Sequence, residues 1–218
     1  MRILASIANV ESLIEAFKND KDIHSKTASD IFKKNIEEIT PQERRMAKAV
    51  NFGIIYGISG FGLSENLNIT QKEAKIFIEE YLNAYPEIKT YMDETIKKAH
   101  ELGYVKTIFG RIRIIPELQN KNYMIRQAGE RMALNTPIQG TSADIIKKAM
   151  IEVENKINKN NLKSKMILQI HDELVIDTKN EEIEDIKQIL KESMENVCKL
   201  NVPLKIEINI GNDLYEAK

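Results

Sequence analysis

The chain has 218 residues, of which 42% are hydrophobic and 30% are charged, a composition that excludes a disordered chain and a small disulfide scaffold. Its 32 basic and 33 acidic side chains give a formal net charge of -1, so any surface that binds a polyanion must be local. Cys198, the single cysteine, fits a reducing compartment, and no apolar run reaches the roughly 20 residues that span a bilayer. We therefore expect a cytoplasmic protein with no membrane partner.

The first part of the chain carries apolar residues at helical spacing, which predicts a run of helices up to about Gly103. Asp22, two residues before His24, is expected to open one of these helices. His24 has a structural role there unless an anionic ligand lies nearby. Thr70 and Glu73, three residues apart, form a candidate capping box for a later helix.

Beyond this point the pattern favours strands and one long helix. Two β-favouring runs around a Phe-Gly turn predict a hairpin over residues 104–116. A helical stretch follows over residues 123–158, and Pro137 is expected to kink or break it, because its ring disfavours helical backbone at the preceding residue.

The last part of the chain predicts a second hairpin, a helix and a strand. Residues 165–177 contain two apolar β-type runs around a charged centre, and a helix over 181–200 and a strand over 204–210 follow. The fold class that we expect is α+β, with a helical part followed by a mostly antiparallel sheet that helices cover.

One face of the helix expected over residues 42–57 carries two cations followed by two aromatic rings. Arg44, Lys48, Phe52 and Tyr56 lie four residues apart, along a stripe about 18 Å long. Positive charge beside flat apolar rings suits a ligand with an anionic tail and a planar base, such as a nucleoside triphosphate. From spacing alone, the commoner arrangement is a helix that buries Phe52 and Tyr56 in the core and leaves the cations in water.

His171, Asp172 and Glu173 lie between two apolar β-type runs. Three polar side chains at that position must face water in a turn or find a partner, because an unpaired buried carboxylate is costly. Two adjacent acids suit a hard divalent cation such as Mg²⁺, although neighbouring side chains on a strand point in different directions. The alternative is a surface hairpin turn, in which His and Asp are common.

Arg131, Asn135 and Gln139 repeat the four-residue spacing later in the chain, with Gln139 just past Pro137. Their guanidinium and amide groups suit hydrogen bonds to minor-groove acceptors of a duplex, which do not depend on its sequence. The alternative is a structural role at the interruption of a helix by proline.

The order and spacing of these segments resemble the family A DNA polymerases, the bacterial DNA polymerase I type. Residues 44–57, RRMAKAVNFGIIYG, match the RRxxKxxxFGxxYG motif of the family's fingers, and residues 169–173, QIHDE, match the QxHDE motif of its palm. The resemblance covers essentially the whole chain. It implies template-directed DNA synthesis in replication or repair, in which a primer 3′ hydroxyl attacks a deoxynucleoside triphosphate (dNTP) by a two-metal mechanism and pyrophosphate leaves.

By this resemblance, five side chains would bind the incoming dNTP. Arg44 and Lys48 would hold its triphosphate, with His24 helping at the phosphate end. Phe52 would pack on the sugar and base, and Tyr56 would close the pocket behind the template base. Phenylalanine at position 52 also implies rejection of dideoxynucleotides.

The resemblance also assigns the metal site and the DNA contacts. Asp172 would bind the catalytic pair of Mg²⁺ ions, with Glu173 supporting the site. The primer-template duplex would be contacted or supported by Arg131, Asn135, Gln139 and His171.

The resemblance divides the chain into three parts. Residues 1–20 would begin the palm-to-fingers connection with a truncated palm strand, residues 21–103 would be helical fingers, and residues 104–218 would be a palm of hairpins and helices. The family's first palm aspartate and its thumb have no counterpart here, so we expect a partly supplied Mg²⁺ site, missing N-terminal polymerase segments, and weak or no synthesis by this chain alone.

Two other functions stay open at this point. A non-catalytic DNA-binding accessory module would bind primer-template DNA in a salt-dependent way, without Mg²⁺ or nucleotide. A structural protein would bind neither DNA nor nucleotide. Two residues depart from the family's pattern, namely Ile112, where an arginine is usual, and Ser6, where a histidine is common.

Overall fold

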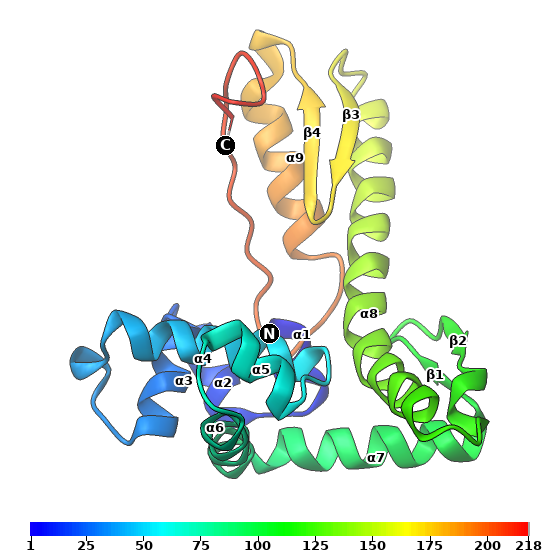
Figure 1. Cartoon of the computed structure of the whole chain (residues 1–218). Coiled ribbons are helices and arrows are strands. Elements are labelled where there is room, and N and C mark those ends of the chain that lie inside the picture. The colour runs from blue at the N-terminus through cyan, green and yellow to red at the C-terminus, as the bar shows by residue number, and fades with distance from the viewer. Residues whose placement is uncertain (218) are drawn as a thin grey trace. The chain divides into compact units, whose positions relative to one another are not determined.

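The computed structural model describes residues 1–217. It contains two compact units: an N-terminal unit, Met1–Thr141, and a C-terminal unit that begins at Ser142. Figure 1 follows the chain through both units from blue to red. None of the helices in the described residues has the length and apolarity that spanning a bilayer requires. The predicted division into fingers and palm is a functional one and stays a prediction.

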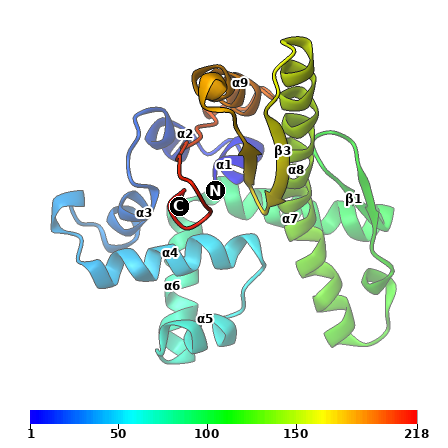
Figure 2. The ribbon, with the colours of Figure 1, turned by 90° about the horizontal axis from the view of Figure 1, so that it is seen from above.

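The first part of the N-terminal unit is helical, as predicted. Its elements are α1 (Arg2–Ile7), α2 (Glu11–Lys18), α3 (Ile23–Phe32), the 3₁₀ helix η1 (Ile36–Glu38), α4 (Pro41–Ile55), α5 (Gly60–Leu67), α6 (Gln71–Ala84) and α7 (Pro86–Leu102). Helix α3 packs against both α4 and α6 (Figure 2). The truncated palm strand expected at the start of the chain is wrong, because residues 2–7 form α1. Its adjacent residues Leu4 and Ala5 are both buried, whereas successive side chains of a strand point to opposite faces.

Local capping residues fix where three of these helices begin. Asp22 caps α3. The predicted capping box of Thr70 and Glu73 is confirmed at the start of α6. Thr40 and Glu43 form a second capping box ahead of α4. Each cap satisfies backbone N–H groups that the helix leaves open, and its loss typically costs about 1 kcal/mol.

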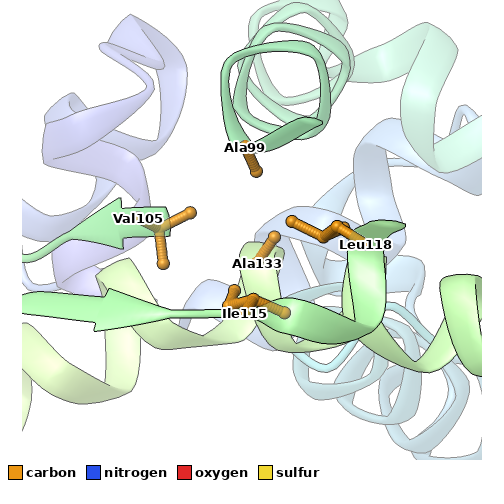
Figure 3. Packing of buried hydrophobic residues seen from close by; sticks show 5 residues of the cluster. All are labelled: Ala99, Val105, Ile115, Leu118 and Ala133. Atoms are coloured by element: carbon orange, nitrogen blue, oxygen red, sulfur yellow. The ribbon is translucent and has the colours of Figure 1, made fainter. Parts of the chain in front are cut away.

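The predicted first hairpin is confirmed. β1 (Tyr104–Lys106) pairs antiparallel with β2 (Ile112–Ile114), and Gly110 supplies a positive φ of 84° in the connecting turn. The 3₁₀ helix η2 (Pro116–Gln119) then leads to α8 (Tyr123–Lys159). Figure 3 shows the buried cluster that fixes the hairpin and η2 against α7 and α8, made of Ala99, Val105, Ile115, Leu118 and Ala133.

Pro137 lies inside α8, so of the two expected effects, a kink or a break, the break does not occur. A proline removes the N–H that would bond to the carbonyl four residues earlier. Beside it, the Thr136 hydroxyl donates to the Met132 carbonyl at 2.7 Å and accepts from Arg113 Nη1 at 3.1 Å. These side-chain hydrogen bonds and the fully buried Ala133 lie beside the proline, in a helix that continues through it.

The C-terminal unit is built on a second hairpin, also as predicted. β3 (Lys165–Ile170) pairs antiparallel with β4 (Glu173–Asp177), and the 3₁₀ helix η3 (Asn180–Glu182) leads into α9 (Ile183–Glu195). The end of α8 and α9 share a buried cluster, on which β4 packs, made of Val153, Ile157, Ile186, Ile189 and Leu190. The α+β class is confirmed, although the described residues form two separate two-stranded sheets in place of the single sheet that we expected. Helix α9 ends before the expected residue 200.

The prediction of a strand over residues 204–210 is wrong, because this segment pairs with no strand in the described residues. Ile206 and Ile208 are half-buried against the cluster of α8 and α9, and residue 207 between them is exposed. This alternation is typical of a strand, but the Ile206 amide donates to Glu195 Oε1 at 3.2 Å. A cavity of 1210 Å³ is lined by both β4 and residues 205–217. The segment therefore has the alternation of a strand, but no other strand among the described residues pairs with it.

Candidate active site

The stripe of cations and aromatic rings lies on the exposed side of α4. Phe52 and Tyr56 are 46% and 50% exposed, and Arg44 and Lys48 are exposed as well. The core side of α4 is formed instead by residues that are at most 3% exposed, among them Ala47, Val50 and Ile54. This excludes the arrangement in which the two rings are core residues, so four side chains that a nucleotide could use face solvent together.

An ion pair joins this stripe to the start of α3. Arg44 donates from Nε to Asp22 Oδ2 at 2.8 Å, and its Nη2 lies 2.7 Å from the same oxygen. The other oxygen, Asp22 Oδ1, accepts from the backbone amides of His24 and Ser25 at 2.8 and 3.1 Å. Burial by itself would raise the pKa of the Asp22 carboxyl, but the hydrogen bonds from Ser25, Arg44 and His24 outweigh it and lower that pKa. Arg44 is therefore fixed in place, with Nη1 outside the pair.

His24 lies in the first turn of α3, beside the aromatic part of the stripe. Its ring centroid is 5.8 Å from that of Phe52, and the amide nitrogen of Asn51 lies 3.1 Å from its Nδ1. Burial is the largest effect and lowers the pKa of His24; the charge of Asp22 opposes it, and the cations of α4 add to it. The neutral ring is therefore favoured at this position.

Lys48 is exposed and forms no ion pair within residues 1–217. It lies one turn after Arg44 on the same face of α4. Like charges four residues apart destabilise a helix by about 0.2–0.5 kcal/mol, a cost that a bound anion removes. The free ammonium of Lys48 beside the fixed guanidinium of Arg44 thus makes this end of the stripe the part suited to phosphate.

The structure brings the α4 stripe next to the polar stripe predicted on α8. Gln139 donates from Nε2 to the Tyr56 hydroxyl at 3.2 Å. Gly57 has a φ of 62°, and a Cβ there would lie 3.0 Å from Cγ of Arg131. Asn135 lies between these two α8 residues, and its buried Oδ1 has no hydrogen-bond partner within residues 1–217. Two motifs far apart in the sequence are therefore one surface.

The first hairpin packs on α8 directly after Gln139. Arg111 donates from Nη2 to the carbonyl of Gly140 at 2.9 Å, and the Thr141 hydroxyl accepts a backbone amide of the hairpin loop at 3.2 Å. A Cβ at Gly140 would lie 2.7 Å from Cγ2 of Thr107, so this approach requires glycine. The hairpin thus fixes the turn of α8 that presents Gln139.

The acid motif forms the tip of the second hairpin, in the C-terminal unit. His171 and Asp172 are the two turn residues between β3 and β4, and Glu173 begins β4. All three are exposed, and His171 has a left-handed backbone with a φ of 52°. Gln169 donates from Nε2 to the His171 carbonyl at 2.5 Å. The motif is thus a surface turn, and its carboxylates face solvent.

These two carboxylates fit part of a divalent-cation site. The side chains of Asp172 and Glu173 have no hydrogen-bond or ion-pair partner within residues 1–217, and carboxylate oxygens are the ligands that Mg²⁺ prefers. No three His, Cys, Asp or Glu side chains among the described residues lie close enough together to hold a metal ion. A divalent cation held by Asp172 and Glu173 would therefore need further ligands.

Asn51 and Thr27, which support His24, were missed from the sequence. Asn51 is fully buried and bonds to both His24 and Thr27, which lie on α3. The available signal was its position, since asparagine is a weak helix former and here stands between Val50 and Phe52 in the middle of a helix.

Comparisons with known proteins give the family of the chain. A family model described as DNA polymerase family A matches residues 1–216. The chain is 50% identical over 218 residues to DNA polymerase I of Bacillus subtilis (strain 168), and 50% identical over 218 residues to DNA polymerase I of Caldicellulosiruptor bescii. Each match covers 100% of this chain, but only 25% and 26% of the relative.

A solved structure agrees with the family match. The POL domain of Pol1 from M. smegmatis, in complex with DNA primer-template and dNTP, has a TM-score of 0.94 and 40% sequence identity, and the match covers 99% of this chain and 38% of that chain. The chain therefore belongs to DNA polymerase family A, as its motifs predicted. It spans about a quarter of the length of the DNA polymerases I that it matches.

Proposed function

We propose that this chain carries the nucleotide-binding helix and part of the metal site of a template-directed DNA polymerase, which transfers a nucleotide from a dNTP to a primer 3′ hydroxyl. The observation that carries the proposal is the exposed α4 stripe, with His24 beside it and Gln139 of α8 bonded to its end. It is supported by the relatives, which are DNA polymerases I, and by the similar M. smegmatis domain, whose complex holds primer-template DNA and dNTP.

The incoming dNTP lies along α4 in this proposal. Lys48 and Arg44 hold the triphosphate, and His24 donates a hydrogen bond at the phosphate end. The Phe52 ring packs on the sugar and base, and Tyr56 closes the pocket behind the template base. The order of the stripe supports this, because its two cations precede its two rings as the phosphates precede the base in a nucleotide.

The primer-template duplex is held by residues beside the end of the stripe and at the acid turn. Their guanidinium, amide and imidazole groups can reach acceptors that all base pairs share in the minor groove, so they test the shape of the duplex rather than its sequence. The bond from Gln139 to Tyr56 supports a contact surface continuous with the pocket. The residues that contact or support the duplex are Arg131, Asn135, Gln139 and His171.

Asp172 and Glu173 would hold Mg²⁺ through their carboxylate oxygens. Bound Mg²⁺ ions stabilise the attacking and leaving oxygens in phosphoryl transfer. The remaining ligands come, in this proposal, from palm residues outside the present chain, so the chain alone is expected to show weak or no synthesis. A cytoplasmic location and a place in replication or repair belong to the same proposal.

Nucleotide binding tests the proposal most directly. We expect Lys48→Ala to weaken binding of a fluorescent dNTP about tenfold or more, the usual range for a charge-assisted contact, measured by fluorescence anisotropy. Lys72→Ala is the matched control, because Lys72 is an exposed lysine on α6, away from the stripe. Equal binding by the two variants would refute the assignment of the stripe to nucleotide.

Primer extension tests the metal assignment. The chain alone and a longer version that includes the preceding palm segment would be assayed with Mg²⁺, each with and without Asp172→Ala. We expect robust synthesis only by the longer version, and its loss on Asp172→Ala. If the short chain synthesises DNA well and Asp172→Ala abolishes this, its metal site is complete. Salt-dependent DNA binding that ignores both Mg²⁺ and dNTP would favour the accessory module instead.

A further inference from the structure

Asn51 is a fully buried polar residue in the middle of α4, directly before Phe52 of the stripe. A buried side-chain amide needs hydrogen-bond partners, because burying it unpaired is costly. Its Nδ2 lies 3.0 Å from the Thr27 hydroxyl and 3.1 Å from His24 Nδ1. The two hydrogens of one NH₂ group are therefore aimed at two residues of α3.

The direction of these hydrogen bonds follows from Thr27. Its hydroxyl lies 2.8 Å from the Ile23 carbonyl one turn earlier in α3, nearer than the 3.3 Å to Asn51 Oδ1. A hydroxyl has one proton to donate, so a Thr27 hydroxyl that donates to Ile23 must accept from its other neighbours. The Tyr85 hydroxyl, in turn, donates to Asp30 Oδ2 at 2.7 Å. Thr27 thus requires the NH₂ side of Asn51 to face it.

The side-chain NH₂ group of Asn51 consequently faces His24 Nδ1 as a hydrogen-bond donor. A ring nitrogen that faces an N–H must be unprotonated, so the neutral ring carries its proton on Nε2. The charged groups around the ring are Asp22 on α3, Arg44 and Lys48 on α4, and the amino group of Met1. Burial and the three positive groups disfavour the protonated ring, and only Asp22 favours it.

We infer that Asn51, oriented by Thr27, is a positioning residue that holds His24 as the Nε2–H tautomer, with Nε2 as the ring donor left for a phosphate oxygen of the nucleotide. A neutral N–H donor beside Arg44 and Lys48 adds a directed hydrogen bond without adding a third charge. The inference about the tautomer rests on the network alone. Its consequence for the phosphate rests on the proposed function.

Nitrogen-15 NMR of the histidine rings tests the tautomer without any nucleotide. The chain has three histidines, so His24→Gln identifies the His24 signals and His100 and His171 serve as internal references. Above the pKa of the ring, we expect acceptor-type Nδ1 and proton-bearing Nε2 in the unmodified chain. A proton on Nδ1 of His24 would overturn the inference at once, before any variant is made.

Two variants test the positioning by Thr27. Thr27→Val is close in shape but lacks the hydroxyl, so Asn51 loses its fixed partner and we expect His24 to show a mixture of tautomers. Thr27→Ser keeps the hydroxyl, and the Nε2–H form should be retained. An unchanged His24 spectrum in Thr27→Val would count against the inference. His100 and His171 should not change in either variant, since neither is bonded to Thr27 or Asn51.

Asn51→Asp replaces the side-chain donor that faces His24 Nδ1 by an acceptor. A carboxylate accepts rather than donates, so we expect it to protonate Nδ1 and to raise the pKa of His24 in an NMR titration. In binding assays, Thr27→Val should weaken dNTP binding about two- to tenfold, the range for one neutral hydrogen bond, and leave nucleoside binding unchanged. A tautomer shift in a chain that binds no nucleotide would support the positioning role and refute the proposed function.

Discussion

Gln139 on α8 donates a 3.2 Å hydrogen bond to the hydroxyl of Tyr56, the residue that directly follows α4. The bond joins side chains 83 positions apart in the sequence. It connects the helix proposed to hold the nucleotide with the helix proposed to contact the duplex, so a change at one of these surfaces has a direct contact through which to affect the other.

A double-mutant cycle measures how much this hydrogen bond contributes to the free energy of unfolding. Tyr56→Phe keeps the ring and removes the acceptor, and Gln139→Ala removes the donor. Because Tyr56 is 50% exposed, we expect a coupling of about 0.5 kcal/mol in the free energy of unfolding, at the low end for a hydrogen bond. Urea denaturation of the parent, both single variants and the double variant gives the value. Strictly additive effects would mean that the bond contributes nothing to stability.

Gly57→Ala is expected to destabilise the protein by about 1–3 kcal/mol, the cost of a left-handed backbone for a residue other than glycine. The new Cβ would also lie 3.0 Å from Arg131 Cγ. Gly103→Ala is the matched control, since Gly103 has a φ of 74° and nothing within 4 Å of its ideal Cβ. Thermal unfolding should therefore show a larger loss of stability for Gly57→Ala than for Gly103→Ala. When Arg131→Ala is added to both variants, the difference between their losses of stability should become smaller.

Glu43, at the start of α4, is expected to make the stability of the fold depend on pH in a defined direction. Its pKa is lowered to about 2 from 4.5, first by the hydrogen bond from Lys34 and then by the Thr40 backbone amide. A carboxyl with a lowered folded-state pKa stabilises the fold above its unfolded pKa, and this contribution is lost as the pH falls toward the folded value. The stability advantage of the parent over Glu43→Gln should therefore be full above about pH 4.5 and vanish near pH 2, measured by denaturation at each pH. A constant difference across that window would contradict the assignment.

The second hairpin leaves apolar strand surface in water. Ile167 and Ile170 of β3 are 54% and 41% exposed, and both line the cavity that β4 shares with residues 205–217. Exposed apolar strands favour association between chains. We expect the chain to self-associate in sedimentation, and Ile167→Lys to reduce this. Ile151→Lys is the matched control, because Ile151 is 63% exposed but lies on helix α8. If Ile167→Lys and Ile151→Lys reduce self-association equally, its cause is exposed apolar surface in general and not the strand.

Elements whose signal is local were predicted well from the sequence. The capping box of Thr70 and Glu73 forms within one turn of chain, and the turn containing Gly110 closes a hairpin of neighbouring segments. Such features depend on residues a few positions apart, so the sequence contains all of the interacting partners. The same holds for the four-residue spacing that places Lys48 and Phe52 on one face of α4.

Elements that depend on a distant partner were predicted poorly. Residues 204–210 have the alternation of a strand, but a strand forms only when another strand pairs with it. Pro137 carries a local signal for a break, yet α8 continues through it, with hydrogen bonds of Thr136 and Arg113 beside it. For residues 204–210 the missing contact is a distant one, and beside Pro137 the hydrogen bond from Arg113 comes from 23 residues earlier in the chain.

The sequence by itself determined the family, the helical character of the first half and which side chains stand together on α4, because motif spacing and helical periodicity are properties of the chain. Only the tertiary structure decided that Phe52 and Tyr56 face water, that Arg44 is held by Asp22, and that Asn51 faces His24. Burial and hydrogen-bond direction depend on which segments pack together, and that is settled when α3 and α4 come into contact.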